Sequence, residues 1–168
     1  MRLINNASEE KLRGGFYTPS PIASFILKWA FNGNKEFDIL EPSCGDGVFL
    51  EVFKENEYSN YLAFEIDKEI ITDTIKVVNS SFVSFNLNEQ FDLIIGNPPY
   101  IRWKNLEQEL KNELSTNELW DKYCNSLCDY SNIFIIKSIE LLKEGGELIF
   151  ITPEYWLNTT HSIKMRNY

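Results

Sequence analysis

The residues that could do chemistry gather in three short segments, of which the last along the chain is the most unusual. An apolar run, Phe91–Ile95, ends at Gly96 and is followed directly by Asn97-Pro98-Pro99-Tyr100. Neither proline has the N–H that a central strand needs, so the strand has to end in a rigid corner. Such a corner could hold a planar substrate that carries an amine, or it could be a stiff turn with a packing tyrosine.

A glycine-containing loop with two carboxylates is the second segment. Residues Glu41–Phe49 have the sequence EPSCGDGVF, in which Gly45 and Gly47 allow a tight turn and a close approach of the backbone to a ligand. The loop lacks the third glycine of a dinucleotide fingerprint and the lysine of a P-loop. Glu41 and Asp46 would repel a pyrophosphate, so the loop predicts a cationic or hydroxyl-rich ligand.

The third segment is Phe64–Asp67, with the sequence FEID. Its Glu65 lies about twenty positions beyond the glycine loop, where an acidic residue can bind both hydroxyls of a ribose. Loop and acid together predict a nucleoside without a phosphate tail. S-adenosylmethionine fits, because it combines ribose, adenine, an amino acid and a sulfonium cation. The alternative is an ordinary strand–helix turn with solvated acids.

The elements that must position these segments alternate between strand and helix. Short apolar runs predict buried strands at 37–40, 61–65, 82–85, 91–95 and 147–152. Helical patterns predict helices at 21–31, 48–55, 68–77 and 133–143, the last stopped by Gly145-Gly146. The alternation predicts an α/β fold with a mainly parallel sheet of about five strands and helices on both faces. Residues 101–130 break the rhythm and are interpreted as an insertion.

The bulk properties indicate one domain in a chain of 168 residues, 43% hydrophobic and 24% charged. No apolar segment approaches the ~20 residues that span a bilayer, and the N-terminal residues lack the apolar core of a signal peptide, so we expect a cytoplasmic protein. The three cysteines are interpreted as reduced thiols rather than a zinc site. The net charge of −9 disfavours DNA binding by this chain alone, because phosphate contacts need Lys and Arg.

Taken together, the three segments resemble the motifs of γ-class S-adenosylmethionine-dependent adenine-N6 DNA methyltransferases. Gly14–Pro19, with the sequence GGFYTP, is similar to the segment that precedes the cofactor strand in this class and closes over the methionine end. The resemblance runs from Gly14 to Leu157. It implies a Rossmann-like class I methyltransferase, of prokaryotic origin, from a restriction–modification system.

The resemblance also assigns roles to individual residues. It implies that S-adenosylmethionine is bound by Phe16, Tyr17, Thr18, Pro19, Glu41, Pro42, Ser43, Gly45, Asp46, Gly47, Glu65, Ile66, Phe82 and Asn97. It implies catalysis by Asn97, Pro98, Pro99 and Tyr100; from the few Cys and His residues we expect no metal site. The Asn97 side-chain oxygen and the Pro98 carbonyl would accept hydrogens from the adenine amine, and Tyr100 would stack on a base flipped out of the duplex. Where the family has an Asp-Phe pair on the adenine of the cofactor, this chain has Ser81-Phe82.

The family's sheet continues with further strands and then a target-recognition domain, and residues 158–168 leave no room for either. We therefore expect residues 1–168 to be an incomplete catalytic portion without that domain, with DNA contacted through a recognition domain or subunit elsewhere. An apolar edge at 148–151 would then be open to a partner chain or to self-association. Two alternatives remain open, namely a protein glutamine N5-methyltransferase and a catalytically silent cofactor-binding or assembly fragment.

Overall fold

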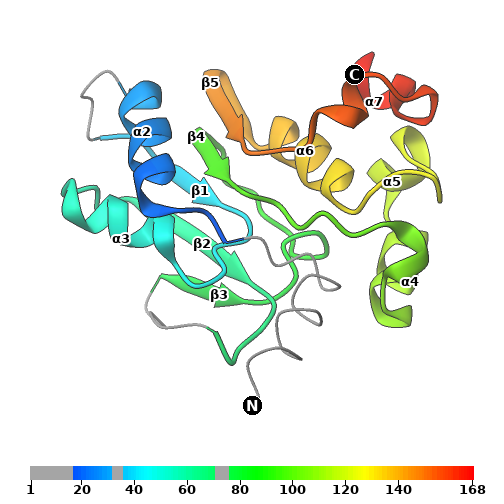
Figure 1. Cartoon of the computed structure of the whole chain (residues 1–168), viewed down its shortest axis with the longest axis horizontal. Helices are drawn as coiled ribbons and strands as arrows, with labels where there is room; N and C mark the ends of the chain where they lie inside the picture. Colours follow the sequence, from blue (N-terminus) through cyan, green and yellow to red (C-terminus); the bar gives the residue numbers. More distant parts are fainter. Residues whose placement is uncertain (1–16, 32–35, 71–75) are drawn as a thin grey trace. The chain divides into compact units, whose positions relative to one another are not determined.

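A five-stranded parallel sheet organises the protein, as seen in a computed structural model that describes residues 17–31, 36–70 and 76–168 (Figure 1). The strands are β1 (Ile39–Glu41), β2 (Tyr61–Glu65), β3 (Val77–Asn79), β4 (Phe91–Gly96) and β5 (Leu142–Phe150). Their order is β3-β2-β1-β4-β5, and every neighbouring pair is parallel. The strand order reverses between β1 and β4, which is where open α/β sheets bind ligands. The predicted α/β fold with a mainly parallel sheet is confirmed.

The chain divides into two compact units. The sheet unit comprises residues 17–98 and 138–151 and holds the strands together with helices α2 (Ser20–Phe31) and α3 (Val48–Glu55). The described part of the second unit comprises residues 99–137 and 152–168. Helix α6 (Ser131–Glu140) crosses from the second unit into the sheet unit after Lys137.

The core of the sheet unit lies between the sheet and the two helices α2 and α3, which pack side by side (Figure 1). Apolar side chains that alternate along the strands point to these helices, so Ile39, Leu93 and Ile95 are at most 1% exposed. The core on this face consists of Ala23, Leu27, Ile39, Cys44, Phe49, Leu50, Val52, Phe53, Tyr58, Ala63, Leu93 and Ile95. The packing of these apolar side chains holds β1, β2 and β4 against one another, and it therefore fixes the positions of the residues at the strand ends.

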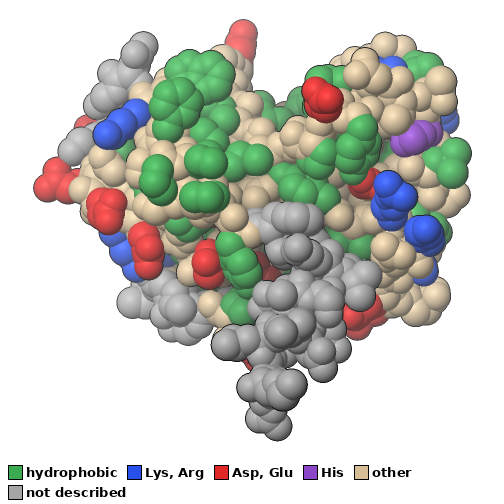
Figure 2. Space-filling model, viewed as in Figure 1, with side chains coloured by type: hydrophobic (Ala, Val, Ile, Leu, Met, Phe, Trp, Pro, Cys, Tyr) green, Lys and Arg blue, Asp and Glu red, His purple; other side chains and the backbone are tan. Residues whose placement is uncertain are grey.

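The outer face of α2 is also apolar. Ile22, Phe25 and Trp29 recur at helical spacing and are 46%, 68% and 73% exposed. Figure 2 shows hydrophobic side chains gathering over this helix. The helix therefore buries one apolar stripe against the sheet and presents a second one at its surface.

The third strand lies five residues before its predicted place. Residues 82–85, predicted as a strand, form a turn, and β3 is Val77–Asn79. Phe82 and Phe85 instead pack edge-on against Phe64, with ring centroids 5.6 and 5.1 Å away. The prediction of a helix at 68–77 is wrong for the described residues at its two ends. Residues 68–70 form a turn, and Val77 starts β3. Residues 71–75 lie outside the described part. An aromatic-rich run was mistaken for a strand because a packed turn buries the same residue types.

The helix predicted at 133–143 ends earlier, and β5 starts where that helix was expected to continue. Helix α6 stops at Glu140, and Leu142 already pairs with Phe91. The Gly145-Gly146 pair, predicted as a helix stop, lies inside β5, and the pairing register shifts there. Gly145 has a φ of +79°, a left-handed conformation that glycine adopts at little cost. Together with the register shift, this conformation shows that the pair forms a β-bulge.

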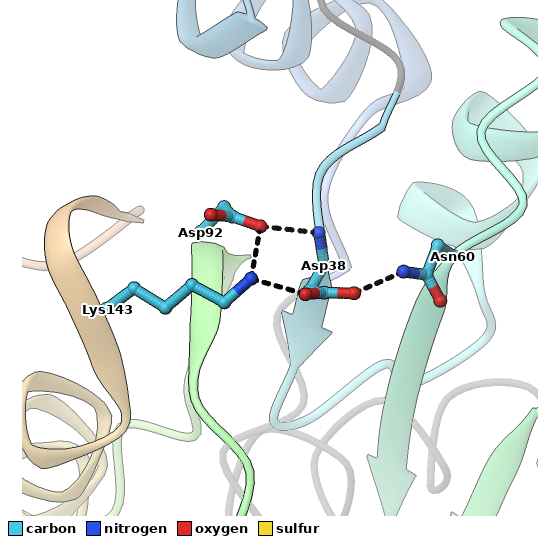
Figure 3. A network of polar contacts seen from close by, with 4 residues as sticks. All are labelled: Asp38, Asn60, Asp92 and Lys143. Atoms are coloured by element: carbon cyan, nitrogen blue, oxygen red, sulfur yellow. Dashed lines mark hydrogen bonds and ion pairs between the residues drawn. The ribbon is translucent and has the colours of Figure 1, made fainter.

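A network of polar side chains joins the beginnings of β1, β2, β4 and β5 (Figure 3). It lies at the end of the sheet opposite the loops that follow β1, β2 and β4. Lys143 Nζ lies between the carboxylates of Asp38 and Asp92, at 2.8 Å from Asp92, and Asn60 donates a hydrogen bond to Asp38. Asp92 also accepts the Asp38 N–H at 2.9 Å. Partial burial by itself raises the pKa of Asp92, but the hydrogen bonds from Lys143 and the Asp38 N–H outweigh it and lower that pKa below its usual value. The network explains why Lys143 belongs to the sheet and not to α6.

Gly146→Ala is expected to destabilise the sheet unit by about 1–3 kcal/mol, because the added methyl group has no room. Its carbon would lie 3.0 Å from the carbonyl oxygens of Phe91 and Lys143, and backbone atoms cannot rotate away. Denaturant unfolding measures the change. Gly145→Asn is the matched control. No atom lies within 4 Å of the position that a Cβ at residue 145 would occupy, and asparagine tolerates the left-handed region. We therefore expect a smaller loss of stability. Equal losses in both variants would contradict the steric argument.

The second unit contains short helices joined by turns. These are η1 (Trp103–Asn105), α4 (Gln108–Ser115), α5 (Glu118–Tyr123), η2 (Glu154–Leu157), η3 (Thr160–Ser162) and α7 (Ile163–Arg166). Trp103 stacks on Trp120 with ring centroids 5.6 Å apart, and Arg166 donates to the carbonyls of Trp156 and Thr159 at 2.7 Å each. None of the helices in the described ranges has the length and apolar character required to cross a membrane.

Candidate functional site

The glycine loop that follows β1 folds tightly at the start of α3. Gly45 and Gly47 have φ values of +56° and +90°, which glycine adopts freely and other residues rarely do. Gly47 is the residue that precedes α3, and the Cys44 N–H donates to the Phe64 carbonyl at 2.8 Å. The predicted turn thus has the expected geometry, and it is tied to the end of β2.

Glu65 holds the loop and the end of β2 together. Its Oε2 accepts the Gly45 N–H at 2.9 Å, and its Oε1 accepts the Asp67 N–H at 2.8 Å. Burial raises the pKa of Glu65, while the N–H groups of Asp67, Gly45 and Ile66 act in the opposite direction. The glycine loop and the acid that follows it about twenty positions later, which the sequence grouped by spacing alone, are in direct contact.

Glu41, at the end of β1, is the most deeply buried carboxyl group of the site. The residue is 1% exposed, and its Oε2 has no hydrogen-bond partner among the described residues. Gly96 lies beside it: a methyl group added to Gly96 would lie 3.6 Å from the Cγ of Glu41 and 3.5 Å from the Cδ of Pro42. Burial first, then repulsion by Glu65 and Asp46, holds the pKa of Glu41 well above its usual value.

Asn97, which directly follows β4, is anchored by two other segments. Its Nδ2 donates to the Thr18 hydroxyl at 3.1 Å, and its carbonyl accepts the Ser43 hydroxyl at 3.3 Å. Thr18 lies just before α2, 79 residues away along the chain. The first half of the proline corner is therefore joined to the glycine loop and to the segment before α2.

The remaining predicted residues of the sheet unit differ in exposure. Tyr17 is 46% exposed and its ring lies 3.7 Å from a Cβ built at Gly45, so it packs beside the glycine loop. Ile66 is 56% exposed, and Asp46 and Pro19 are also exposed. Phe82 is only 2% exposed, and its ring packs against Phe64.

Two predicted site residues belong to the second unit, and a third lies outside the described residues. Phe16 is outside the described residues. Pro99 and Tyr100 follow Pro98 directly in the chain but belong to the second unit. Burial raises the pKa of Tyr100 above its usual value, so its hydroxyl stays protonated in the neutral range.

Asn79 is a site residue that sequence reasoning missed. Its Nδ2 donates to the carbonyls of Glu65 and Ile66, at 2.9 and 3.1 Å, and so fixes the backbone that carries both residues. An asparagine at a strand end is a signal for such a contact, but the third strand was predicted at 82–85, and Asn79 was not recognised as a strand end.

The described residues of the site combine buried carboxyl groups with a glycine turn and an anchored amide. No group of three or more His, Cys, Asp or Glu side chains in the described ranges could hold a metal ion. Cys44 is buried and its pKa is raised, chiefly by burial and then by Glu41, so it is not an activated thiol. Buried carboxylates, a glycine turn and an anchored amide suit a ligand that carries hydroxyl groups and positive charge.

Comparisons with known proteins give the family and the fold. The family model described as Eco57I restriction-modification methylase matches residues 20–168. The Type II methyltransferase M.HincII of Haemophilus influenzae is 49% identical over 155 residues, which are 92% of this chain and 30% of that protein. The chain spans about 30% of the length of the curated relatives that it matches first.

Two solved structures share the fold at low sequence identity. The structure titled DrdV–DNA complex aligns with a TM-score of 0.70 and 18% identity, over 96% of this chain and 23% of that chain. An S-adenosylmethionine-dependent methyltransferase from Clostridium acetobutylicum aligns with a TM-score of 0.52 and 20% identity, over 92% of this chain and 60% of that chain. The predicted Rossmann-like class I methyltransferase fold is confirmed.

S-adenosylmethionine is the cofactor of this family and fold. The residues present fit it, because the unpartnered Oε2 of Glu41 offers an acceptor to a cation and Glu65 stands beside the glycine loop as ribose binding requires. The contacts between individual residues and the cofactor remain predictions. The chain belongs to the Eco57I restriction-modification methylase family.

Proposed function

We propose that this chain is the catalytic portion of a restriction–modification enzyme that transfers a methyl group to the N6 amine of adenine in DNA. The observation that carries the proposal is the anchoring of Asn97 at the end of β4 by Thr18 and Ser43, next to the buried carboxyl groups. A side-chain amide that Thr18 orients, on a backbone that Ser43 holds, is suited to bind a planar amine in a fixed orientation.

The sheet unit would bind the cofactor through three groups of this chain. Glu65 would accept hydrogen bonds from the two ribose hydroxyls. Its carboxylate oxygens still have free lone pairs after accepting the N–H groups of Gly45 and Asp67. Glu41 and Asp46 would face the positively charged end. The exposed Ile66 would cover a face of the adenine ring. S-adenosylmethionine supplies an electrophilic methyl group on its sulfonium.

The proline corner would activate the substrate amine. The lone pair of an exocyclic adenine amine is delocalised into the ring, which makes the amine a poor nucleophile. Two acceptors, Asn97 Oδ1 and the Pro98 carbonyl, would bind the two amine hydrogens and favour a pyramidal nitrogen. Because Thr18 and Ser43 hold Asn97 and the prolines restrict the backbone, little reorganisation is needed at the moment of reaction. Tyr100 would stack on the flipped base.

DNA would be bound mainly by parts of the enzyme outside this chain. The net charge of −9 disfavours binding of phosphates by this chain alone. We place the enzyme in the bacterial cytoplasm, where restriction–modification systems find their DNA.

The site of methylation tests the proposal. The purified chain would be incubated with S-adenosylmethionine that carries a deuterated methyl group and with duplex DNA, and in parallel with single strands that contain either adenine or cytosine alone. Nucleoside mass spectrometry is expected to find the label in N6-methyladenine only. Label in methylcytosine, or on glutamine of an added protein, would overturn the proposal; cofactor binding without any transfer would favour a catalytically silent fragment.

A further inference from the structure

Glu41 has an electrostatic environment that differs from that of the other carboxyl groups of the site. The residue is 1% exposed, and its Oε2 is buried without a hydrogen-bond partner among the described residues. An ionised carboxylate in such a place loses its hydration and gains nothing in return. Glu65, by contrast, accepts an N–H with each of its oxygens.

Among the described residues, the groups that face Glu41 are acidic or neutral. Glu65 from β2 and Asp46 from the glycine loop both repel a negative charge on it. The Cys44 thiol is close enough for Glu41 to raise its pKa. From β4 the neighbour is Gly96, which carries no side chain. No Lys, Arg or His of the described residues pairs with Glu41.

We propose that Glu41 holds a proton in the ligand-free protein and gives it up to solvent when a cationic ligand occupies the site. This inference rests on the proposed cofactor site. In the free protein the O–H bond of the Glu41 carboxyl group is intact. When a positive charge of the ligand arrives at Oε2, that bond breaks, the electron pair stays on the carboxylate and the proton goes to the buffer. The cation then pairs with the buried oxygen that had no partner.

The proton release predicts how cofactor affinity depends on pH. Below the raised pKa of free Glu41, each binding event releases up to one proton, so affinity increases by up to about tenfold per pH unit as the pH rises. Above that pKa the carboxyl group is already ionised, and the affinity becomes independent of Glu41. A site with an always-ionised carboxylate would show no such slope.

Titration calorimetry of the 168-residue chain with S-adenosylmethionine tests the inference. The titrations would be run at about pH 6, below the range in which a free α-amino group titrates, in buffers that differ in ionisation enthalpy. The observed enthalpy is expected to vary with the buffer by an amount that gives a net release of protons, up to one per ligand bound. Glu41→Gln is expected to bind more weakly and to release no proton. Glu55→Gln, which removes an exposed glutamate at the end of α3, should keep the release unchanged.

Difference infrared spectroscopy of the unsubstituted chain gives a second readout in case the variant binds too weakly. Addition of the cofactor should remove the C=O band of a protonated carboxyl group and add a carboxylate band. Binding with no proton release and no loss of that band overturns the inference and leaves the proposed function standing. Absence of binding in every buffer overturns the proposed cofactor site and the inference with it.

Discussion

Replacing Asn97 with alanine is expected to lower the rate of methyl transfer by about 10²–10³-fold, the usual loss when one preorganised polar group is removed from a reacting centre. The reason is that the Asn97 amide, which Thr18 anchors at 3.1 Å, would supply one of the two acceptors for the amine in the proposed mechanism. Cofactor affinity should change much less than the rate. Single-turnover transfer to DNA and calorimetric binding measure the two quantities separately.

Two further variants separate catalysis from folding in this prediction. Asn88→Ala removes an exposed asparagine from the loop before β4 and should leave the rate unchanged. Thr18→Val keeps the shape of Thr18 but removes the oxygen that orients Asn97, so we expect an intermediate loss of rate. A fully active Asn97→Ala variant with an intact fold would show that another group binds the amine, and the proposed role of the corner would be abandoned.

Glu65→Ala is expected to weaken cofactor binding by about 100-fold or more. Each hydrogen bond from a hydroxyl to a charged carboxylate contributes about 1.5–3 kcal/mol, and two such bonds to the ribose would be lost. The variant also removes the acceptors of the Gly45 and Asp67 N–H groups, which hold the glycine loop against β2. Calorimetry gives the affinity, and thermal unfolding shows whether the loop's anchor also stabilises the fold.

Glu69→Ala is the matched control for this variant, since Glu69 is exposed in the turn after β2 and its backbone N–H, which alanine keeps, bonds to Asp67. Its cofactor affinity should stay within about twofold of the unsubstituted chain. Glu65→Asp keeps the charge on a shorter side chain, so its cofactor affinity should lie between those of Glu65→Ala and Glu69→Ala. Unchanged affinity in Glu65→Ala would remove Glu65 from the ribose site.

Some secondary-structure elements lie where the sequence predicts them, and others do not. Helix α3 occupies the predicted residues because Gly47 sets its start and a strong apolar periodicity sets its length. The third strand was missed because three residues carry too little pattern, whereas the aromatic turn at 82–85 carries more. Lys143 was assigned to a helix because helical periodicity continues past Glu140. In the structure Leu142 already pairs with Phe91, and Lys143 contacts Asp38 and Asp92 near the start of β5.

The sequence by itself determined which residue types could form the site, because glycine turns, strand-end acids and the double proline are local features with local causes. Its alternation of strand and helix patterns also predicted a mainly parallel sheet whose carboxyl ends converge, although the third strand and the helix before it were misplaced. The tertiary structure alone decided how these residues meet. The bond from Asn97 to Thr18 spans 79 residues, and Glu65 reaches Gly45 across 20. The burial of Glu41 without a partner for Oε2 is likewise a property of packing, because the loss of hydration depends on neighbours from separate strands and not on the sequence around it.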